Sequence, residues 1–269
     1  MLKNYVAICV IILLFQSCSS TNIKIEDEMK KYFDEYKVEG TFALYNNAQG
    51  NFNIYNLSRY KDSAYTPAST FKIVNSLIGL QTGKIINTKM QIKWDGIDRG
   101  MPAWNKDLTM EEAFKVSCVP YYQEVARRIG KDTMQIWLDS LSYGTKKITS
   151  KIDTFWLDNS LKIKPDEQMG LVKKLYFEQL PFHKTTMQAV KNVMVQSVDS
   201  NYTLAYKTGW GQNENGKAIG WVVGWIEEAK HPSFFVLNIE GDKDIDMVNI
   251  RKSILTKCLT QLGYMVGKK

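Results

Sequence analysis

The chain has 269 residues, of which 44% are hydrophobic and 12% aromatic, with 35 lysine and arginine residues against 28 aspartate and glutamate residues. This composition excludes a disordered chain and provides a sizeable core for one large domain or two modest ones. The net charge of +7 comes from single lysines interspersed with acidic residues. Such a distribution favours a solvated surface over a nucleic-acid groove.

The first residues have the pattern of a secretory signal peptide. Lys3 precedes an unbroken apolar run at positions 5–15, which is about half the length that a bilayer crossing requires. The small Ser17 stands directly before Cys18, as at the cleavage site of bacterial lipoproteins. We therefore expect residues 1–17 to be removed and Cys18 to be lipidated, so that the protein is exported to the periplasm and held on a membrane by its lipid alone.

Cysteine usage favours neither a disulfide framework nor a metal site. Cys9 leaves with the signal peptide and Cys18 would be acylated, so Cys118 and Cys258 remain, far apart in the chain. No cysteine spacing resembles that of a zinc site, and we expect no metal.

The N-terminal part predicts a helix followed by a hairpin. Residues 25–36 have the periodicity of an amphipathic helix. The segments 41–47 and 51–57 flank a turn that contains Gly50, which is typical of a β-hairpin. A further helix is expected to begin within 66–77.

The middle of the chain is predicted to be helical. Thr109 and Glu112 form a capping-box signature. A helix from about Tyr121 is expected to end at Gly130. Further helices are expected over 165–180, opened by a Pro-Asp-Glu sequence, and over 185–196.

The C-terminal part predicts strands at 202–209, 218–228 and 233–241, and a final amphipathic helix over 247–262. Short, turn-rich connections such as 212–217 favour antiparallel pairing. The sequence therefore predicts an α/β (α+β) fold in which both termini form a central antiparallel β-sheet flanked by helices, with an inserted all-helical lobe. We expect the sheet part at about 24–65 and 200–269, the lobe at about 67–198, and a site in the cleft between them.

Ser69 and Lys72 are the first candidates for chemistry. Positions i and i+3 share one face of a helix, and a serine hydroxyl needs a neighbouring base to become a nucleophile. A lysine can act as that base only without its charge, which the apolar neighbours and the positive end of the helix dipole would favour. The pattern alone is weak, because Ser58 and Lys61 repeat it in a polar stretch where we expect no helix.

Two later motifs strengthen this candidate. Ser117 and Val119 stand in a Ser-Cys-Val sequence after the helix that Thr109 caps, although a helix-terminal serine is common. Residues 207–209 read Lys-Thr-Gly, a cation, a hydroxyl and a glycine where a ligand can approach the backbone. Gly209 and Gly211 do not begin a dinucleotide-binding loop, because Glu214 stands where that pattern requires its third glycine.

In this order, S-x-x-K, a second serine motif and K-T-G form the signature of serine β-lactamases and penicillin-binding proteins. Further stretches match one branch of that group: WDG at 94–96, SYG at 142–144, FWLD at 155–158 and RKSI at 251–254. Over nearly all of residues 18–269 the chain resembles the class D serine β-lactamases. The resemblance implies the serine β-lactamase/penicillin-binding-protein fold and an enzyme that opens penicillin-type β-lactam antibiotics through an acyl-serine intermediate, and so confers antibiotic resistance.

The resemblance also implies roles for single residues. Ser69 would be the nucleophile. Lys72, carbamylated by carbon dioxide, would be the general base for acylation and deacylation, with no other cofactor. Trp156 would hydrogen-bond the carbamate, Ser117 would relay a proton to the leaving nitrogen, and Lys207 would support the local electrostatics.

For the substrate, the resemblance implies that Thr208 and Arg251, beside Gly209, receive the carboxylate. The backbone N–H groups of Ser69 and Trp210 would form the oxyanion hole. The pocket walls would be Val119, Met101, Trp104 and Leu157.

Some positions depart from the family pattern. Thr145 stands where asparagine is usual, Trp210 where phenylalanine is common, and Cys118 where larger aliphatic residues are common. The apolar Val119 replaces the asparagine of penicillin-binding proteins and class A enzymes, and it should raise the cost of a charged Lys72.

Other interpretations predict different behaviour. Glu167 could act as a carboxylate base, but its setting is that of a helix N-terminus. His183 and His231 lack partners for a catalytic triad, and Cys118 lacks a nearby activating group. Two rivals to hydrolysis are an antibiotic-sensing receptor domain that acylates without turnover and a D-Ala-D-Ala peptidase.

Overall fold

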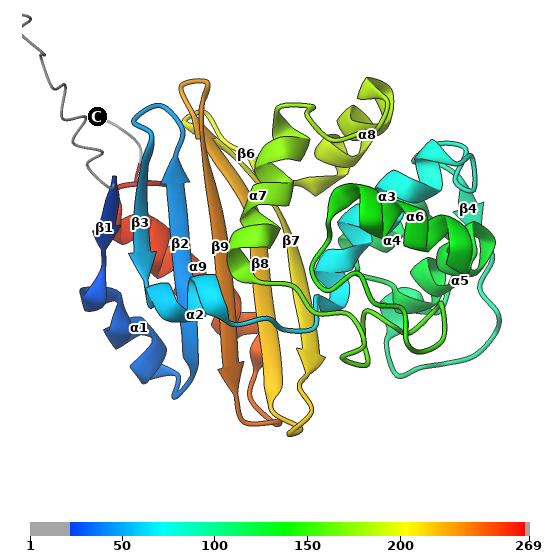
Figure 1. Cartoon of the computed structure of the whole chain (residues 1–269), viewed down its shortest axis with the longest axis horizontal. Helices are drawn as coiled ribbons and strands as arrows, with labels where there is room; N and C mark the ends of the chain where they lie inside the picture. Colours follow the sequence, from blue (N-terminus) through cyan, green and yellow to red (C-terminus); the bar gives the residue numbers. More distant parts are fainter. Residues whose placement is uncertain (1–21, 267–269) are drawn as a thin grey trace, which may run out of the picture.

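The computed structural model describes residues 22–266, so the expected signal peptide at 1–17 and the lipidation of Cys18 lie outside the described residues. Within this part of the chain, seven strands form one sheet in the order β1-β3-β2-β9-β8-β7-β6, with helices on both of its faces (Figure 1). None of the helices described is long and apolar enough to span a membrane. The mixed α/β fold expected from the sequence is confirmed.

The elements follow in chain order. The strands of the large sheet are β1 Ile23–Ile25, β2 Glu39–Asn46, β3 Asn51–Tyr55, β6 Val195–Val198, β7 Tyr202–Gln212, β8 Ala218–Glu228 and β9 His231–Gly241. A small second sheet pairs β4 Gln91–Ile92 with β5 Leu108–Thr109. The helices are α1 Lys30–Glu35, α2 Leu57–Asp62, α3 Lys72–Gln81, α4 Met110–Lys115, α5 Val119–Ile129, α6 Lys131–Leu141, α7 Pro165–Tyr176, α8 Lys184–Met194 and α9 Met247–Gln261. Short 3-10 turns are η1 Asp27–Met29, η2 Ala68–Phe71 and η3 Pro102–Trp104.

Both ends of the chain contribute to the large sheet. β7, β8 and β9 form an antiparallel meander of three 11-residue strands. β2 pairs antiparallel with β9 and with β3, which joins the N-terminal hairpin to the C-terminal meander. Helices α3, α4, α5 and α6 form a lobe to the side of β7, whereas α2 and α7 pack on the sheet itself (Figure 1).

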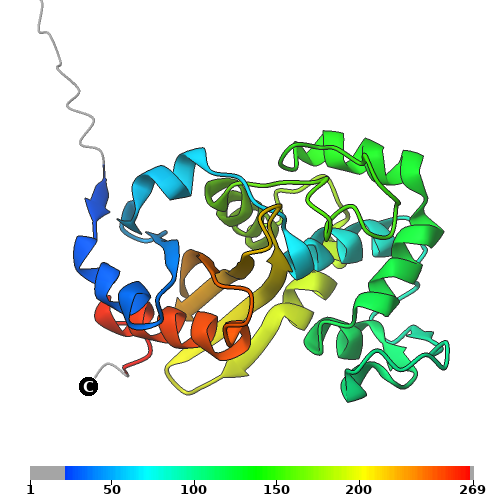
Figure 2. The same ribbon diagram turned by 90° about the horizontal axis from the view of Figure 1, so that it is seen from below.

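Alternate residues of each strand pack against different layers. Along β9, Phe235 and Leu237 belong to a core shared with α1 and α9, whereas Phe234 and Val236 belong to a larger core shared with the helices on the opposite face. Figure 2 shows α1 and α9, blue and red, below the sheet, with the lobe to one side. Burial on both faces explains why these strands read as continuous apolar runs.

The N-terminal segment differs from its prediction. A helix was expected over 25–36. Instead, β1 extends to Ile25, a 3-10 turn follows, and the α-helix begins only at Lys30. β1 pairs parallel with β3, so the sheet is not wholly antiparallel. This short strand satisfies backbone groups on the open edge of β3, as in the bond from Phe52 N to Asn22 O at 2.6 Å.

The second strand of the hairpin ends earlier than expected. Asn56 has a left-handed conformation (φ +56°), and its side chain accepts a hydrogen bond from Arg59 N, so that α2 begins directly after it. Ser58 and Lys61 therefore lie on a helix, which contradicts our expectation. Both are exposed, so this copy of S-x-x-K lacks the burial that an uncharged lysine requires.

Three helical predictions need correction. The helix expected over 165–180 ends at Tyr176, and Glu178 beyond it has a left-handed φ of +56°. The helix expected over 185–196 ends at Met194, because Val195 is extended and begins the edge strand β6, which pairs with β7. α6 was not predicted.

Candidate active site

Ser69 and Lys72 lie at the junction of η2 and α3. The tight 3-10 turn brings their side chains together, and Lys72 Nζ donates a hydrogen bond to Ser69 Oγ over 2.7 Å. Sequence analysis expected both residues on one helix, whereas Ser69 belongs to the 3-10 turn and α3 begins at Lys72. Lys72 is fully buried and Ser69 is 9% exposed.

The environment of Lys72 disfavours its charge. Burial lowers the pKa of its amine to about 7, so a large fraction is uncharged at neutral pH. The ring of Tyr122, centred 5.5 Å from Nζ, favours the charged form. The pKa of Lys72 is lowered because desolvation outweighs the opposing electrostatic influence of Cys118.

Ser117 and Lys207 form a second pair. Ser117 lies between α4 and α5 with a left-handed φ of +57°, after the helix that Thr109 and Glu112 cap as predicted. Lys207 Nζ donates to Ser117 Oγ over 3.0 Å and to Thr208 O over 3.2 Å. Burial, followed by the charges of Lys72 and Arg251, holds the pKa of Lys207 well below its ordinary value.

Arg251 of α9 reaches the strand that carries Lys207. Its guanidinium donates to Gly209 O over 2.6 Å, and burial lowers its pKa to about 10, so it stays charged at neutral pH. Thr208 is half-buried and Trp210 is 50% exposed. The bond of the charged Arg251 ends on a neutral carbonyl oxygen, so this cation remains available to an anion.

Gly209 allows β7 to approach the turn that bears Ser69. A Cβ atom at this position would lie 2.9 Å from Pro67 O and 3.2 Å from the Thr70 methyl group. Both distances are too short for a side chain. The glycine of the Lys-Thr-Gly motif therefore fixes the spacing between strand and nucleophile.

Trp156 supports the same turn from the opposite side. Its carbonyl oxygen accepts from Ala68 N at 3.0 Å and from Thr66 Oγ1 at 2.9 Å. Its indole stacks on Phe71 with ring centroids 5.3 Å apart. Trp156 is fully buried, and its Nε1 has no hydrogen-bond partner within residues 22–266. A buried donor of this kind is costly unless an acceptor is supplied.

The four residues expected to form the pocket walls differ in their position and burial. Val119 begins α5 and Leu157 follows Trp156, and both are half-buried. Met101 and Trp104 lie around η3, in the loop between β4 and β5. Met101 is 45% exposed, and the indole of Trp104 donates to Val116 O over 3.0 Å.

Two residues flagged in the sequence have structural contacts. Glu167 accepts from Lys164 N at 2.9 Å and caps α7, which confirms its interpretation as part of a helix N-terminus. Thr145 Oγ1 accepts from Lys162 N at 3.1 Å, and Thr145 N donates to Lys162 O over 2.8 Å. Thr145 thus anchors the end of the loop that contains Trp156.

Gln168 was missed by the sequence analysis. It is fully buried on α7, and its Nε2 donates to Thr70 Oγ1 over 2.6 Å. Thr70 Oγ1 in turn donates to Pro67 O over 2.7 Å. Because Thr70 follows Ser69, Gln168 braces the turn that positions the nucleophile.

We expect Gln168→Leu to lower the free energy of unfolding by about 1–3 kcal/mol, as for loss of a buried hydrogen bond, and to lower kcat more than KM rises. Thermal unfolding and steady-state turnover kinetics would measure both. Thr70→Val removes the same bond, so the double variant should lose less than the sum of the single losses. Strict additivity would mean that the two residues do not act through their shared bond.

Comparison with known proteins agrees with this geometry. Residues 33–259 match the model of the penicillin-binding protein transpeptidase domain. β-Lactamase OXA-5 of Pseudomonas aeruginosa is 35% identical over 268 residues, which cover 99% of this chain and 100% of that protein. FUS-1 (OXA-85), a class D β-lactamase of Fusobacterium nucleatum subsp. polymorphum, superimposes with a TM-score of 0.85 at 34% identity and covers 90% of this chain and 100% of its own.

The regulatory protein BlaR1 of Bacillus licheniformis is also similar. It is 32% identical over 223 residues, which cover 83% of this chain but 37% of BlaR1. Similarity to hydrolases thus extends over almost the whole chain, whereas similarity to this regulator covers a minor part of the larger protein.

Proposed function

The chain belongs to the class D serine β-lactamases and hydrolyses β-lactams, and from this premise we propose that the reaction runs through an ester on Ser69. Ser69 Oγ attacks the carbonyl carbon of the strained ring while its proton passes to the base at Lys72. The C–N bond of the lactam breaks, and Ser117 gives a proton to the departing nitrogen. Water then attacks the ester, and Ser69 regains its hydroxyl.

One observation carries this proposal: the buried amine of Lys72 lies 2.7 Å from Ser69 Oγ and has a pKa lowered to about 7. A general base must lie within hydrogen-bonding reach of its proton and have a pKa near the working pH. Lys72 meets both requirements. Lys207 donates to Ser117 Oγ over 3.0 Å and would restore the proton that Ser117 gives to the nitrogen.

We further propose that carbon dioxide carbamylates Lys72. Carbamylation requires an uncharged amine, which burial favours here, and the resulting anion requires a donor in a dry site. The unpartnered Nε1 of buried Trp156 fits that need. When formed, the carbamate supplies an anionic oxygen as the general base.

The substrate carboxylate is proposed to bind between Thr208 and Arg251, where Arg251 remains charged. The backbone N–H groups of Ser69 and Trp210 would stabilise the oxyanion. Val119, Leu157, Met101 and Trp104 would line the side of the cleft next to the lobe.

For localisation, we propose export to the periplasm and attachment through a lipid on Cys18. The support is the sequence pattern before Cys18: a lysine, a short apolar run and a small residue at the cleavage position. Metabolic labelling with a radioactive fatty acid tests it. Label incorporated into the protein but absent from Cys18→Ser is the expected result, and unlabelled wild-type protein would contradict it.

A penicillin-binding sensor is the second candidate, favoured by the similarity to BlaR1. Nitrocefin hydrolysis separates the candidates. We expect sustained turnover well beyond one equivalent of enzyme, whereas a single stoichiometric burst would indicate a sensor. Release of D-alanine from D-Ala-D-Ala model peptides would instead indicate a peptidase.

A further inference from the structure

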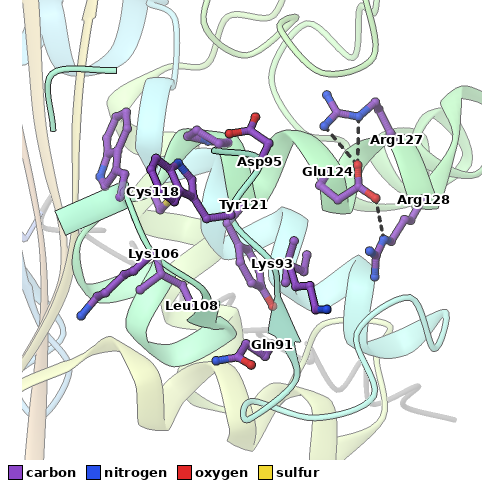
Figure 3. A pocket seen from close by; sticks show the side chains of 14 residues that line it. Gln91, Lys93, Asp95, Lys106, Leu108, Cys118, Tyr121, Glu124, Arg127 and Arg128 are labelled. Carbon is purple, nitrogen blue, oxygen red and sulfur yellow. Dashed lines mark hydrogen bonds and ion pairs between the residues drawn. The ribbon is translucent and has the colours of Figure 1, made fainter. Parts of the chain in front are cut away.

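A second cavity lies in the helical lobe, away from the Ser69–Lys72 pair. It has a volume of about 380 Å³ and is lined by the small β4–β5 sheet, the loop between these strands and α5 along most of its length (Figure 3). This volume lies within the range of small-molecule sites. Neither Ser69 nor Lys72 is among its lining residues.

The polar groups of three aromatic side chains in its wall donate hydrogen bonds within the protein. The indole of Trp94 donates to Ile97 O over 3.1 Å, that of Trp104 donates to Val116 O over 3.0 Å, and the hydroxyl of Tyr121 donates to Met90 O over 3.0 Å. The exposed indole of Trp94 and the half-buried indole of Trp104 therefore offer ring surface to a ligand, whereas Tyr121 is 2% exposed. Such walls favour a planar, ring-bearing molecule.

The acidic groups of the wall are neutralised within the protein. Glu124 pairs with Arg127 at 3.1 Å and with Arg128 at 2.8 Å, as the dashed lines in Figure 3 show. Asp95 accepts two hydrogen bonds from the guanidinium of Arg99.

Two cations of the wall remain available. Lys93 and Lys106 form neither a hydrogen bond nor an ion pair with any residue in the described range 22–266. Their charges are not offset by a bonded carboxylate, so the cavity favours an anion.

Two residues of the cavity wall, Cys118 and Trp104, connect it to the neighbours of Ser117. Cys118, which follows it, contributes to the wall, and Trp104 holds the carbonyl of Val116, which precedes it. Ser117 itself has the left-handed φ of +57°, a conformation that its surroundings must maintain. A molecule that moves Trp104 or Cys118 will therefore disturb the position of Ser117 Oγ.

We propose that this cavity is an accessory site for a small aromatic carboxylate, and that its occupation lowers β-lactam turnover by displacing Ser117. The ring would contact the aromatic walls, and the carboxylate would pair with Lys93 or with Lys106, whose side chains lie on different sides of the cavity (Figure 3). The effect on turnover rests on the proposed role of Ser117, whereas the binding itself does not.

Calorimetry with 1-naphthoate tests the binding in a protein that cannot be acylated. We expect Ser69→Ala to bind 1-naphthoate, and to bind the uncharged 1-naphthamide at least tenfold more weakly. Adding Lys93→Ala and Lys106→Ala should weaken naphthoate binding by about tenfold, as expected when both partly exposed cations are lost. The exposed Lys84 and Lys147, replaced together by alanine, serve as the matched control and should leave the affinity unchanged.

A second variant excludes the catalytic cleft. Arg251→Ala removes the proposed carboxylate partner in the cleft and should leave naphthoate binding intact. No binding at millimolar naphthoate would overturn the accessory site, as would equal affinity for the amide. If Arg251→Ala loses naphthoate binding while the Lys93/Lys106 variant keeps it, the anion binds in the catalytic cleft and the proposal is refuted.

Kinetics of the active enzyme test the coupling to Ser117. Saturating naphthoate should lower kcat for nitrocefin several-fold without raising KM, within the range of ordinary allosteric coupling. The Lys93/Lys106 variant should keep its basal kcat and lose this inhibition. Binding without any change in kcat would overturn the coupling, and a rise in KM alone would indicate competition in the cleft.

Discussion

Replacing Lys72 by alanine is expected to lower kcat for penicillin and nitrocefin hydrolysis by at least about 10²–10⁴-fold, the usual contribution of a positioned base. The amine is the group hydrogen-bonded to Ser69 Oγ, at 2.7 Å, and an unactivated serine is a poor nucleophile. Steady-state rates with a folding check by circular dichroism would measure the loss.

The chain offers a matched control for this substitution. Lys61 belongs to the second S-x-x-K copy and also lies on a helix, but it is exposed. Lys61→Ala should therefore retain activity. Appreciable turnover by a folded Lys72→Ala protein would refute the role of Lys72 as the base.

The pH dependence of turnover follows from the same amine. Its pKa of about 7 means that Lys72 becomes protonated as the pH falls below this value, and a protonated amine neither accepts a proton nor captures carbon dioxide. We expect kcat to fall as the pH drops through about 7, and added bicarbonate to increase the rate above that pH. If degassing and bicarbonate change nothing while Lys72 remains essential, the free amine is the base and the carbamate is absent.

The sheet was largely predictable because its strands have local signals. The strands near 202–212, 218–228 and 231–241 are apolar runs separated by turn residues, and the structure places all three in one meander. β1 was missed because three residues carry too little periodicity and depend on β3 for pairing. The end of α8 was misplaced because Val195 takes its conformation from its pairing with β7.

The site was predictable only where its residues form motifs. Ser69, Lys72, Ser117 and Lys207 stand in recognisable short sequences, and the structure brings them together as two hydrogen-bonded pairs. Gln168 has no such signal, since its contact with Thr70 spans 98 positions of the chain.

The left-handed conformation of Ser117 could not be predicted from the sequence either. It is set by the junction of α4 with α5, and serine itself has little intrinsic preference for this region of backbone space. Local sequence therefore predicts the reacting groups, whereas tertiary contacts determine how they are held.

The strongest test of the carbamate lies at Trp156, whose buried Nε1 has no acceptor among residues 22–266. If this N–H holds a carbamate on Lys72, then removing the N–H should speed loss of carbon dioxide from Lys72 during turnover. We expect Trp156→Ala to show biphasic progress curves, with a fast first phase that decays as carbon dioxide is lost, and to become monophasic when bicarbonate is added.

Trp156→Phe separates this role from packing. Phenylalanine keeps a ring that can stack on Phe71, now 5.3 Å from the indole, but it lacks the N–H group. Trp156→Ala should also lower the free energy of unfolding by about 3–5 kcal/mol through its cavity, whereas Trp156→Phe should lose less stability and show the same bicarbonate-dependent biphasic kinetics. Because Trp156→Phe keeps most of the ring packing that Trp156→Ala removes, an equal kinetic defect in both variants points to the lost donor as the cause. Monophasic, bicarbonate-indifferent kinetics in both would show that Trp156 serves packing alone.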